Sequence, residues 1–293
     1  MLGLQHTKYS QVSTTSPDQV EMSDIETGDG HKSISASQSH LVNGDSGRDM
    51  TIMTPFAVME NWVRPIFAEF FGVMLFVFIG SLSGVVGYPD GDIDGASGLI
   101  AAALAHGLAI FLLIAGIGAV SGGHFNPAVT LGVMCSGGIH LILGCLYIVF
   151  QLVGAICGSA LVLAVLTKEQ FDFINGGATL LGAGIATDKA VGCEWVLTMV
   201  LVSTVLQTAV DSKPSNLAPL AIGMAVAADI LAGGTISGAS MNPARSFGPA
   251  VVSGIWTDQW VYWVGPPAGG ICSALVFKLI LASPDKRWVL KSD

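Results

Sequence analysis

The sequence predicts an all-α membrane protein with six transmembrane helices and two re-entrant half-helices. Three observations support this prediction: an apolar composition, six long apolar runs, and an internal repeat. Of the 293 residues, 52% are hydrophobic and only 11% are charged, and the mean hydropathy is +0.66. Soluble globular proteins are about 45–50% apolar and about 25% charged. We therefore expect lipid, rather than water, to surround most of the chain.

Six apolar runs are long enough to cross the bilayer as helices. A hydrocarbon core of about 30 Å requires roughly 20 mostly apolar residues in helical conformation. The runs cover residues 66–86, 99–120, 139–166, 191–210, 217–236 and 260–282. Polar, turn-forming segments such as YPDGDIDGASG and DSKPSN separate them. No cleavable signal peptide is visible in the first fifty residues, so we expect the first span to direct the chain to the membrane.

The ends of the chain differ in composition from the membrane domain. Residues 1–60 are rich in Ser, Thr, Asp and Gly, and we expect a disordered N-terminal tail there. The membrane domain is predicted over residues 61–285, followed by a short C-terminal tail over 286–293. With six spans, both termini share one side, and that side carries eight of the twelve Lys and Arg residues. The positive-inside rule then predicts that both tails are cytoplasmic.

An internal repeat relates the two halves of the chain. When Asn126 is aligned with Asn242, the segment AHGLAIFLLIAGIGAVSGGHFNPAVT matches AIGMAVAADILAGGTISGASMNPARS at several glycines and at both Asn-Pro-Ala tripeptides. Glu69 and Glu194 stand at matching places in the first and fourth spans. We assign repeat one to residues 64–166 and repeat two to 191–283. Each repeat holds three spans, so the second must enter the membrane inverted.

Each repeat contains one Asn-Pro-Ala tripeptide after a glycine-rich approach. The residues are Asn126, Pro127 and Ala128 in repeat one, and Asn242, Pro243 and Ala244 in repeat two. Asn is a favoured N-cap and Pro is favoured at the first helical position. The short apolar stretch after each tripeptide would rise about 13–15 Å, half of a bilayer. We therefore predict two half-helices that meet N-terminus to N-terminus near the midplane.

This arrangement predicts a pore that rejects cations and protons. Each helix N-terminus carries about half a positive charge, and two facing one lumen repel cations. If each asparagine oxygen caps its own helix, the amide N–H groups remain to donate to water and interrupt a proton wire. Arg245 follows within the second half-helix, where a guanidinium needs a wet cavity or a partner. We favour the pore-facing interpretation over a structural salt bridge.

The segments SGGHFNPAV and SGASMNPARSFGPAVV resemble the two signature segments of the aquaporin (major intrinsic protein) family. The resemblance covers residues 64–287 and implies six spans, two re-entrant half-helices, homotetramers with one pore per subunit, and no cofactor. HFNPAV, DILAGG and KRWVLK look like the aquaporin-8 branch. The stretch SGASMNPARSFGPAVVSG is also similar to plant tonoplast aquaporins. We expect the chain in the plasma membrane, with intracellular membranes as the alternative.

The resemblance also implies roles for individual residues. The four positions of the family's selectivity filter fall on His106, Ile230, Ala239 and Arg245. His124 is expected in the cytoplasmic vestibule, and Glu69 and Glu194 are expected to accept hydrogen bonds from the re-entrant loops. Ile230 replaces the second histidine of water-selective relatives, which predicts a wider filter with one apolar wall.

We therefore predict a passive channel for water, ammonia and hydrogen peroxide, with urea as a further candidate. A water-selective aquaporin is one alternative, and a secondary transporter built on inverted repeats is another. Asn126 and Asn242 are neutral, whereas a transporter usually has a titrating or ion-coordinating group at the midplane. No nucleophile and base pair or metal-ligand spacing suggests an enzyme or a metal site. The five cysteines fit small apolar packing residues.

Overall fold

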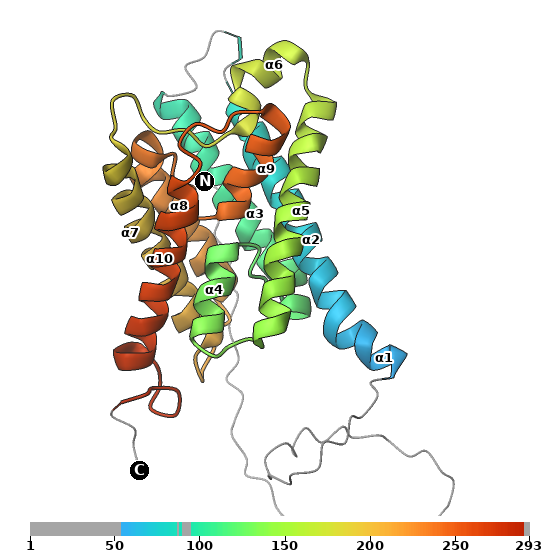
Figure 1. The fold of residues 1–293 in the computed structure, drawn as a ribbon, viewed down its shortest axis with the longest axis vertical. Helices are drawn as coiled ribbons and strands as arrows, with labels where there is room; N and C mark the ends of the chain where they lie inside the picture. Colours follow the sequence, from blue (N-terminus) through green and yellow to red (C-terminus); the bar gives the residue numbers. More distant parts are fainter. Residues whose placement is uncertain (1–53, 87, 90–94, 290–293) are drawn as a thin grey trace, which may run out of the picture. The chain divides into compact units, whose positions relative to one another are not determined.

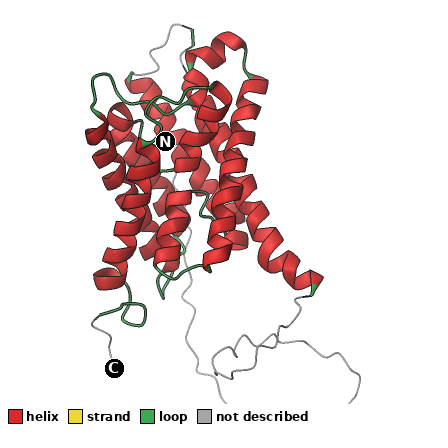
Figure 2. Ribbon diagram, in the orientation of Figure 1, coloured by secondary structure: helices red, strands yellow, loops and turns green. Residues whose placement is uncertain are grey.

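The computed structural model describes residues 54–86, 88–89 and 95–289, and residues 1–53 of the predicted tail lie outside this part. The described residues form helices joined by loops and contain no strand (Figure 2). Six helical stretches are long and apolar enough to cross a membrane, judged by length and composition. The predicted all-α class and the six spans are thereby confirmed.

Six long helices and their short extensions build the bundle in Figure 1. The long helices are α2 (Arg64–Leu82), α3 (Ala96–Ser121), α5 (Leu141–Val165), α7 (Thr187–Val205), α8 (Ala218–Ser237) and α10 (Val261–Val276). Shorter turns precede or extend three of them: α1 (Pro55–Val58), η1 (Met59–Val63), η2 (Ser83–Val85), η4 (Leu206–Val210) and η5 (Phe277–Leu281). The loop between α5 and α7 contains α6 (Lys168–Phe173) and η3 (Asn175–Gly177).

The first helix begins earlier than the sequence suggested. The hydroxyl of Thr54 accepts from the backbone N–H of Ala57 at 3.2 Å, and Pro55 occupies the first helical position. Both are helix start signals, and helical turns continue from there into α2. The predicted boundary of the disordered tail at residue 60 is therefore wrong, because this cap precedes the apolar run used to place it.

The chain also stays attached to the bundle beyond residue 285, where a tail was predicted. After η5 it turns back, and the backbone N–H of Trp288 donates to the carbonyl oxygen of Lys278 at 2.8 Å. The Lys278 ammonium lies 5.7 Å from the centroid of the Trp288 ring, within the range of a cation–π interaction. Residues 286–288 therefore belong to the folded domain.

Two half-helices, α4 (Pro127–Cys135) and α9 (Pro243–Ser253), lie in opposite halves of the bundle (Figure 1). The helix contacts are symmetric between the repeats: α2 packs on α5 as α7 packs on α10, and α3 packs on α8. Each half-helix packs mainly against the third helix of the other repeat, α4 on α10 and α9 on α5. The two repeats are therefore interlocked, and neither half-helix is covered by its own repeat alone.

Glycine allows the close crossings of the long helices. A Cβ on Gly107 would lie 2.7 Å from the carbonyl oxygen of Gly223, and one on Gly223 would lie 2.5 Å from that of Gly107. Real Cβ atoms do not approach backbone oxygen so closely. Gly154 and Gly269 likewise leave no room for a Cβ against the backbones of α2 and α7, respectively. Small residues thus let the membrane helices approach through their backbones, as at other helix interfaces in lipid.

Candidate functional site

Asn126 and Asn242 each cap a half-helix. The Asn126 side-chain oxygen accepts from the backbone N–H of Ala128 at 2.8 Å and of Val129 at 3.4 Å. The Asn242 oxygen accepts in the same way from residues 244 and 245, at 3.0 and 3.2 Å. Both asparagines have extended backbone, and proline follows each at the start of the helix. The capping predicted from the sequence is therefore confirmed.

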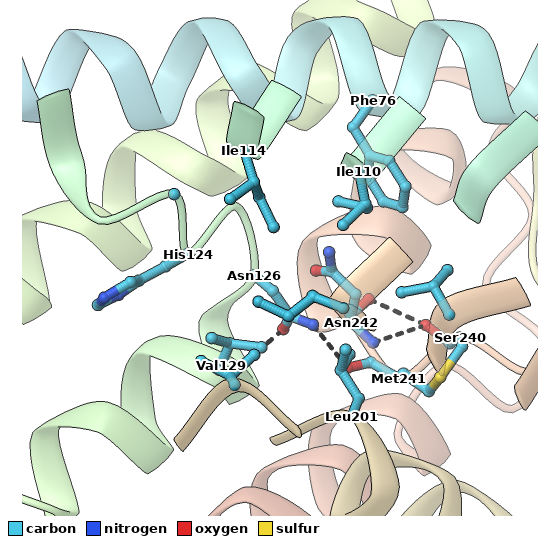
Figure 3. Close-up of a pocket in the computed structure, with 14 residues that line it drawn as sticks. Phe76, Ile110, Ile114, His124, Asn126, Val129, Leu201, Ser240, Met241 and Asn242 are labelled. Carbon is cyan, nitrogen blue, oxygen red and sulfur yellow. Dashed lines mark hydrogen bonds between the residues drawn. The ribbon is translucent and has the colours of Figure 1, made fainter. Parts of the chain in front are cut away.

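The two asparagines also connect the re-entrant loops to each other, which the sequence did not reveal. Asn126 Nδ2 donates to the carbonyl oxygen of Met241 at 2.9 Å (Figure 3). Asn242 Nδ2 donates to the carbonyl oxygen of Phe125 at 3.0 Å. Phe125 and Met241 have positive φ angles of 47° and 54°, an uncommon conformation for bulky residues. One of the two N–H groups of each amide is used in this link, so one remains for a ligand.

Glu69 and Glu194 hold the two loops at equivalent points. Glu69 is fully buried and accepts from the backbone N–H groups of His124 at 2.9 Å and Phe125 at 2.7 Å. Glu194 is fully buried too and accepts from the N–H groups of residues 240 and 241 at 2.8 and 2.7 Å. Ser121 and Ser237 each add a hydroxyl donor at 2.7 Å. These bonds satisfy backbone N–H groups of the two re-entrant loops that no helical hydrogen bond satisfies.

The Glu69 carboxylate accepts from one more hydrogen-bond donor than the Glu194 carboxylate does. Gln151 Nε2 lies 2.7 Å from the Glu69 carboxylate and 2.9 Å from the hydroxyl of Thr130 in α4. The sequence repeat that aligns Tyr147 with Tyr262 places Pro266 opposite Gln151. Proline has no side-chain donor, so the second loop lacks this bond. Gln151 was missed in the sequence because the repeat does not preserve it.

A narrow central cavity lies beside the paired asparagines (Figure 3). Its polar lining includes His124, Asn126, Ser240 and Asn242. The rest is mainly apolar and comes from both repeats: Phe76, Ile110, Ile114, Val129, Leu201, Val205, Ile222, Val226 and Met241. The cavity volume is about 30 Å³, which holds roughly one or two water molecules. Such a lining offers a small polar solute few hydrogen-bonding partners at a time.

His124 connects the central cavity with a wider vestibule. It lines both, and its Nδ1 lies 3.2 Å from the hydroxyl of Thr130. The ring packs edge-on against Tyr147, with 5.4 Å between centroids. The Tyr147 hydroxyl in turn donates to the carbonyl oxygen of Ser121 at 2.9 Å. The vestibule lies at the C-terminal end of α3, because Ser121 closes that helix and lines the same space.

A second wide cavity lies at the other end of α3. It is lined by Gly98 near the start of α3, by Ile230 and Thr235 of α8, and by residues 180–183 of the loop before α7. Of the four predicted filter positions, Ile230 lines this outer cavity, and Ile230 and Ala239 belong to one apolar cluster. Within the described part of the chain, neither this cavity nor the central one is lined by all four positions.

His106 is buried against α2, with 3% of its surface exposed. Its Nδ1 lies 2.8 Å from the carbonyl oxygen of Ala102. A carbonyl oxygen can only accept, so Nδ1 carries the proton. The ring meets Phe76 edge-on, with 5.4 Å between centroids. The Nε2 side approaches Gly80, where a Cβ would lie only 2.3 Å from that nitrogen, so glycine makes room for the ring.

Arg245 is held by the loop between α5 and α7. Its Nη1 donates to the hydroxyl of Thr179 and to the carbonyl oxygen of Gly177 at 3.4 Å. The Thr179 hydroxyl also lies 2.8 Å from that of Ser246. Arg245 forms no salt bridge with any described carboxylate. The guanidinium is therefore oriented by neutral oxygen atoms, and these partners were not predicted from the sequence.

Comparison with known proteins identifies the family. The profile of the family described as "Major intrinsic protein" matches residues 57–277, about three quarters of the chain. The chain belongs to the major intrinsic protein family. Aquaporin-8 of Mus musculus is 44% identical over 235 residues, covering 80% of this chain and 88% of the relative. Aquaporin TIP1-2 of Zea mays is 48% identical over 218 residues, covering 73% and 84%.

A solved structure shows the same fold. The aquaglyceroporin from Plasmodium falciparum superimposes with a TM-score of 0.63 over 75% of this chain and 96% of its own, at 23% identity. The resemblances to aquaporin-8 and to the plant tonoplast type are both confirmed as relationships of this major intrinsic protein. Family and apolar helices together make the chain a multi-pass membrane channel protein. The described residues contain no group of three or more His, Cys, Asp or Glu residues suited to a metal.

Proposed function

We propose that the chain forms a passive channel for water and small neutral solutes, with the paired asparagines at its centre. The observation that carries this proposal is the meeting of two half-helix N-termini at Asn126 and Asn242, which line one narrow cavity. Two positive helix ends facing that cavity oppose cations. The remaining N–H of each amide donates to a passing water and interrupts a chain of proton transfer. The aquaporin-8 and tonoplast-type relatives support the same function.

We further propose that ammonia and hydrogen peroxide pass with water, and that urea is a candidate. The proposed filter consists of His106, Ile230, Ala239 and Arg245. Two of these side chains are apolar, so the filter offers few hydrogen bonds and favours small solutes that need few. Arg245 supplies a fixed positive charge that adds to the barrier against cations.

The proposal extends to assembly and orientation. We infer a homotetramer with one pore per subunit, as the family resemblance implies, in the plasma membrane or an intracellular membrane. The distribution of Lys and Arg supports a cytoplasmic location for both ends of the chain. The vestibule lined by His124 is then the cytoplasmic mouth.

Stopped-flow measurements on one proteoliposome preparation test the function. Water flux above that of protein-free vesicles, linear in the gradient and with a low activation energy, supports a channel; a saturable flux supports a transporter. Ammonia and peroxide fluxes are measured on the same vesicles. If they match protein-free vesicles while water flux is raised, the wider solute range is wrong and a water-selective channel remains. In the matched variant Ile230→His, we expect the ammonia flux and the hydrogen peroxide flux to fall relative to the water flux.

A further inference from the structure

Thr130, near the start of α4, has three hydrogen-bonding partners for one hydroxyl group. The hydroxyl oxygen lies 2.9 Å from Gln151 Nε2 and 2.9 Å from the carbonyl oxygen of Asn126. It also lies 3.2 Å from His124 Nδ1. Thr130 is fully buried, and a hydroxyl has one proton and two lone pairs, so these three partners use its whole hydrogen-bonding capacity. The partner that receives the proton therefore decides which nitrogen of His124 is protonated.

Gln151 donates to Thr130, because Glu69 fixes the orientation of the Gln151 amide. Gln151 Nε2 lies 2.7 Å from the Glu69 carboxylate. That carboxylate also accepts from two backbone N–H groups and one serine hydroxyl, so it offers lone pairs on every side. Gln151 must therefore turn its NH₂ group, rather than its oxygen, toward Glu69. One N–H of this group donates to Glu69, and the other donates to the hydroxyl oxygen of Thr130.

The proton of Thr130 belongs to its bond with the carbonyl oxygen of Asn126. This carbonyl is four positions earlier in the chain, the usual partner of a threonine hydroxyl in a helix. It can only accept, so without the Thr130 proton two oxygen atoms would face each other at 2.9 Å. His124 Nδ1 then cannot receive a proton from Thr130. It must carry its own proton and donate it to the remaining lone pair of the hydroxyl at 3.2 Å.

A neutral His124 with its proton on Nδ1 has a lone pair on Nε2. The Nε2 edge of the ring lies beside Gly122, where a Cβ would be 3.3 Å from this nitrogen. Gly122 and His124 line the vestibule together. His124 also lines the central cavity, as does Asn126 (Figure 3). The ring thus offers a hydrogen-bond acceptor where solutes pass between the vestibule and the central cavity.

We propose that Thr130 is a positioning residue that holds His124 in the Nδ1–H tautomer, and that the Nε2 acceptor favours the passage of ammonia. The second part rests on the proposed channel function. Ammonia has one lone pair and three N–H groups, so a molecule that donates to Nε2 keeps its lone pair free to accept from the Asn126 amide. If Nε2 carried the proton, ammonia would have to release His124 before it could accept from Asn126. Water has two lone pairs and could accept from both.

Repeat two has a pair of serines in place of His124 and Thr130. Ser240 stands at the position of His124, and Ser246 stands at that of Thr130. The two serine hydroxyls lie 2.5 Å apart, and the Ser240 hydroxyl donates to the carbonyl oxygen of Asn242 at 2.9 Å. The proton of Ser240 is therefore engaged, and one of its lone pairs accepts from Ser246. Of the four polar residues that line the central cavity, His124 is thus the one with a ring nitrogen to offer.

Solid-state NMR measures the tautomer independently of any flux. Full-length protein with ¹⁵N-labelled histidine is reconstituted in lipid bilayers at alkaline pH, where free imidazole is neutral. The His124 signals are assigned by their loss in His124→Asn. We expect a protonated Nδ1 and an unprotonated Nε2 in the parent. In Thr130→Val the acceptor of the Nδ1 proton is gone, so the ratio of tautomers should shift toward Nε2–H by about two- to tenfold, as for the loss of one hydrogen bond.

Two further variants separate the role of Thr130 from a general disturbance. Thr130→Ser keeps the hydroxyl and should keep the parental ratio of tautomers. Ser246→Ala removes the hydroxyl at the equivalent place in repeat two and should leave the His124 signals unchanged. A parental protein with the proton on Nε2 overturns the proposal, and this spectrum decides even if Thr130→Val folds poorly. Equal shifts in Thr130→Val and Ser246→Ala would also overturn it.

Stopped-flow measurements on proteoliposomes test the consequence for ammonia. The ratio of ammonia flux to water flux should fall about two- to tenfold in Thr130→Val, in step with the tautomer. Thr130→Ser should restore the parental ratio. An unchanged flux ratio together with a shifted tautomer would overturn the preference for ammonia. A parental ammonia flux equal to that of protein-free vesicles would instead refute the proposed solute range, while the NMR spectrum would still decide the role of Thr130.

Discussion

Asn126 and Asn242 lock the two half-helices to each other. Each side-chain amide donates to the main-chain carbonyl of the residue before the other asparagine, at 2.9 and 3.0 Å. The oxygen of each amide meanwhile caps its own helix. A single side chain thus orders one helix start and one loop of the opposite repeat. Changing either residue should disturb both halves of the site.

The variant Asn126→Ser separates these two tasks. Serine is as good an N-cap as asparagine, but its side chain is too short to reach the carbonyl oxygen of Met241. The loss of that partner in a buried position should reduce the free energy of unfolding by about 1–3 kcal/mol. Asn126→Ala should lose about 1 kcal/mol more because the cap is removed as well. Denaturant unfolding in detergent measures both; a serine variant as stable as the parent would show that the link contributes nothing.

The two buried glutamates should tolerate amide replacement poorly. Glu69→Gln and Glu194→Gln keep the size of the side chain but turn one oxygen into an N–H donor. That group would then face backbone N–H groups that now donate to the carboxylate. Each unsatisfied buried donor costs about 1–3 kcal/mol, so we expect lower unfolding temperatures and lower yields of folded protein. Glu60→Gln is the matched control, because Glu60 lies on the surface in an ion pair with Arg64. Equal stability of Glu69→Gln and Glu60→Gln would contradict the scaffold role.

Close helix crossings should be sensitive to a single added methyl group. A Cβ on Gly154 would lie 2.3 Å from the carbonyl oxygen of Phe70, and one on Gly269 would lie 2.5 Å from that of Trp195. Gly154→Ala and Gly269→Ala should therefore destabilise by about 1–3 kcal/mol, the usual cost of overpacking. In Gly192→Ala a Cβ meets nothing within 4 Å, so this helical variant should keep or raise the stability. Thermal unfolding of the three purified variants compares them; similar losses in all three would refute the packing explanation.

The fold could be predicted from the sequence because helix start signals and apolar runs are local patterns. The repeat can also be found by aligning the sequence with itself. Asn-Pro at residues 126–127 and 242–243 predicts the start of each half-helix, and each apolar run of bilayer length predicts a membrane span. The boundaries at residues 60 and 285 failed for a different reason. They depend on a cap at Thr54 and on a backbone bond from Trp288, neither of which changes the hydropathy.

The parts of the site that escaped prediction depend on contacts distant in the sequence. Gln151 reaches Glu69 across 82 positions, and no repeat marks it. The link between Asn126 and Met241 spans 115 positions and ends on a carbonyl oxygen, which every residue possesses. Composition and spacing cannot indicate such a partner. Tyr147 and Tyr262, in contrast, can be recognised in the sequence because they align in the repeat. In the structure, their hydroxyls donate to the equivalent carbonyl oxygens of Ser121 and Ser237.

Thr179 should control the orientation of Arg245 and thereby the selectivity of the proposed filter. Thr179→Val keeps the shape but removes the hydroxyl that accepts from the guanidinium. Hydrogen bonds to charged groups contribute about 1.5–3 kcal/mol, so the observed orientation should lose about tenfold or more in population relative to others. We expect the ratio of urea flux to water flux to rise, while the folded yield stays close to that of the parent. Thr179→Ser retains the hydroxyl and should keep the parental ratio. A Val variant with the parental ratio would show that Gly177, the other acceptor of Arg245, suffices to hold the side chain.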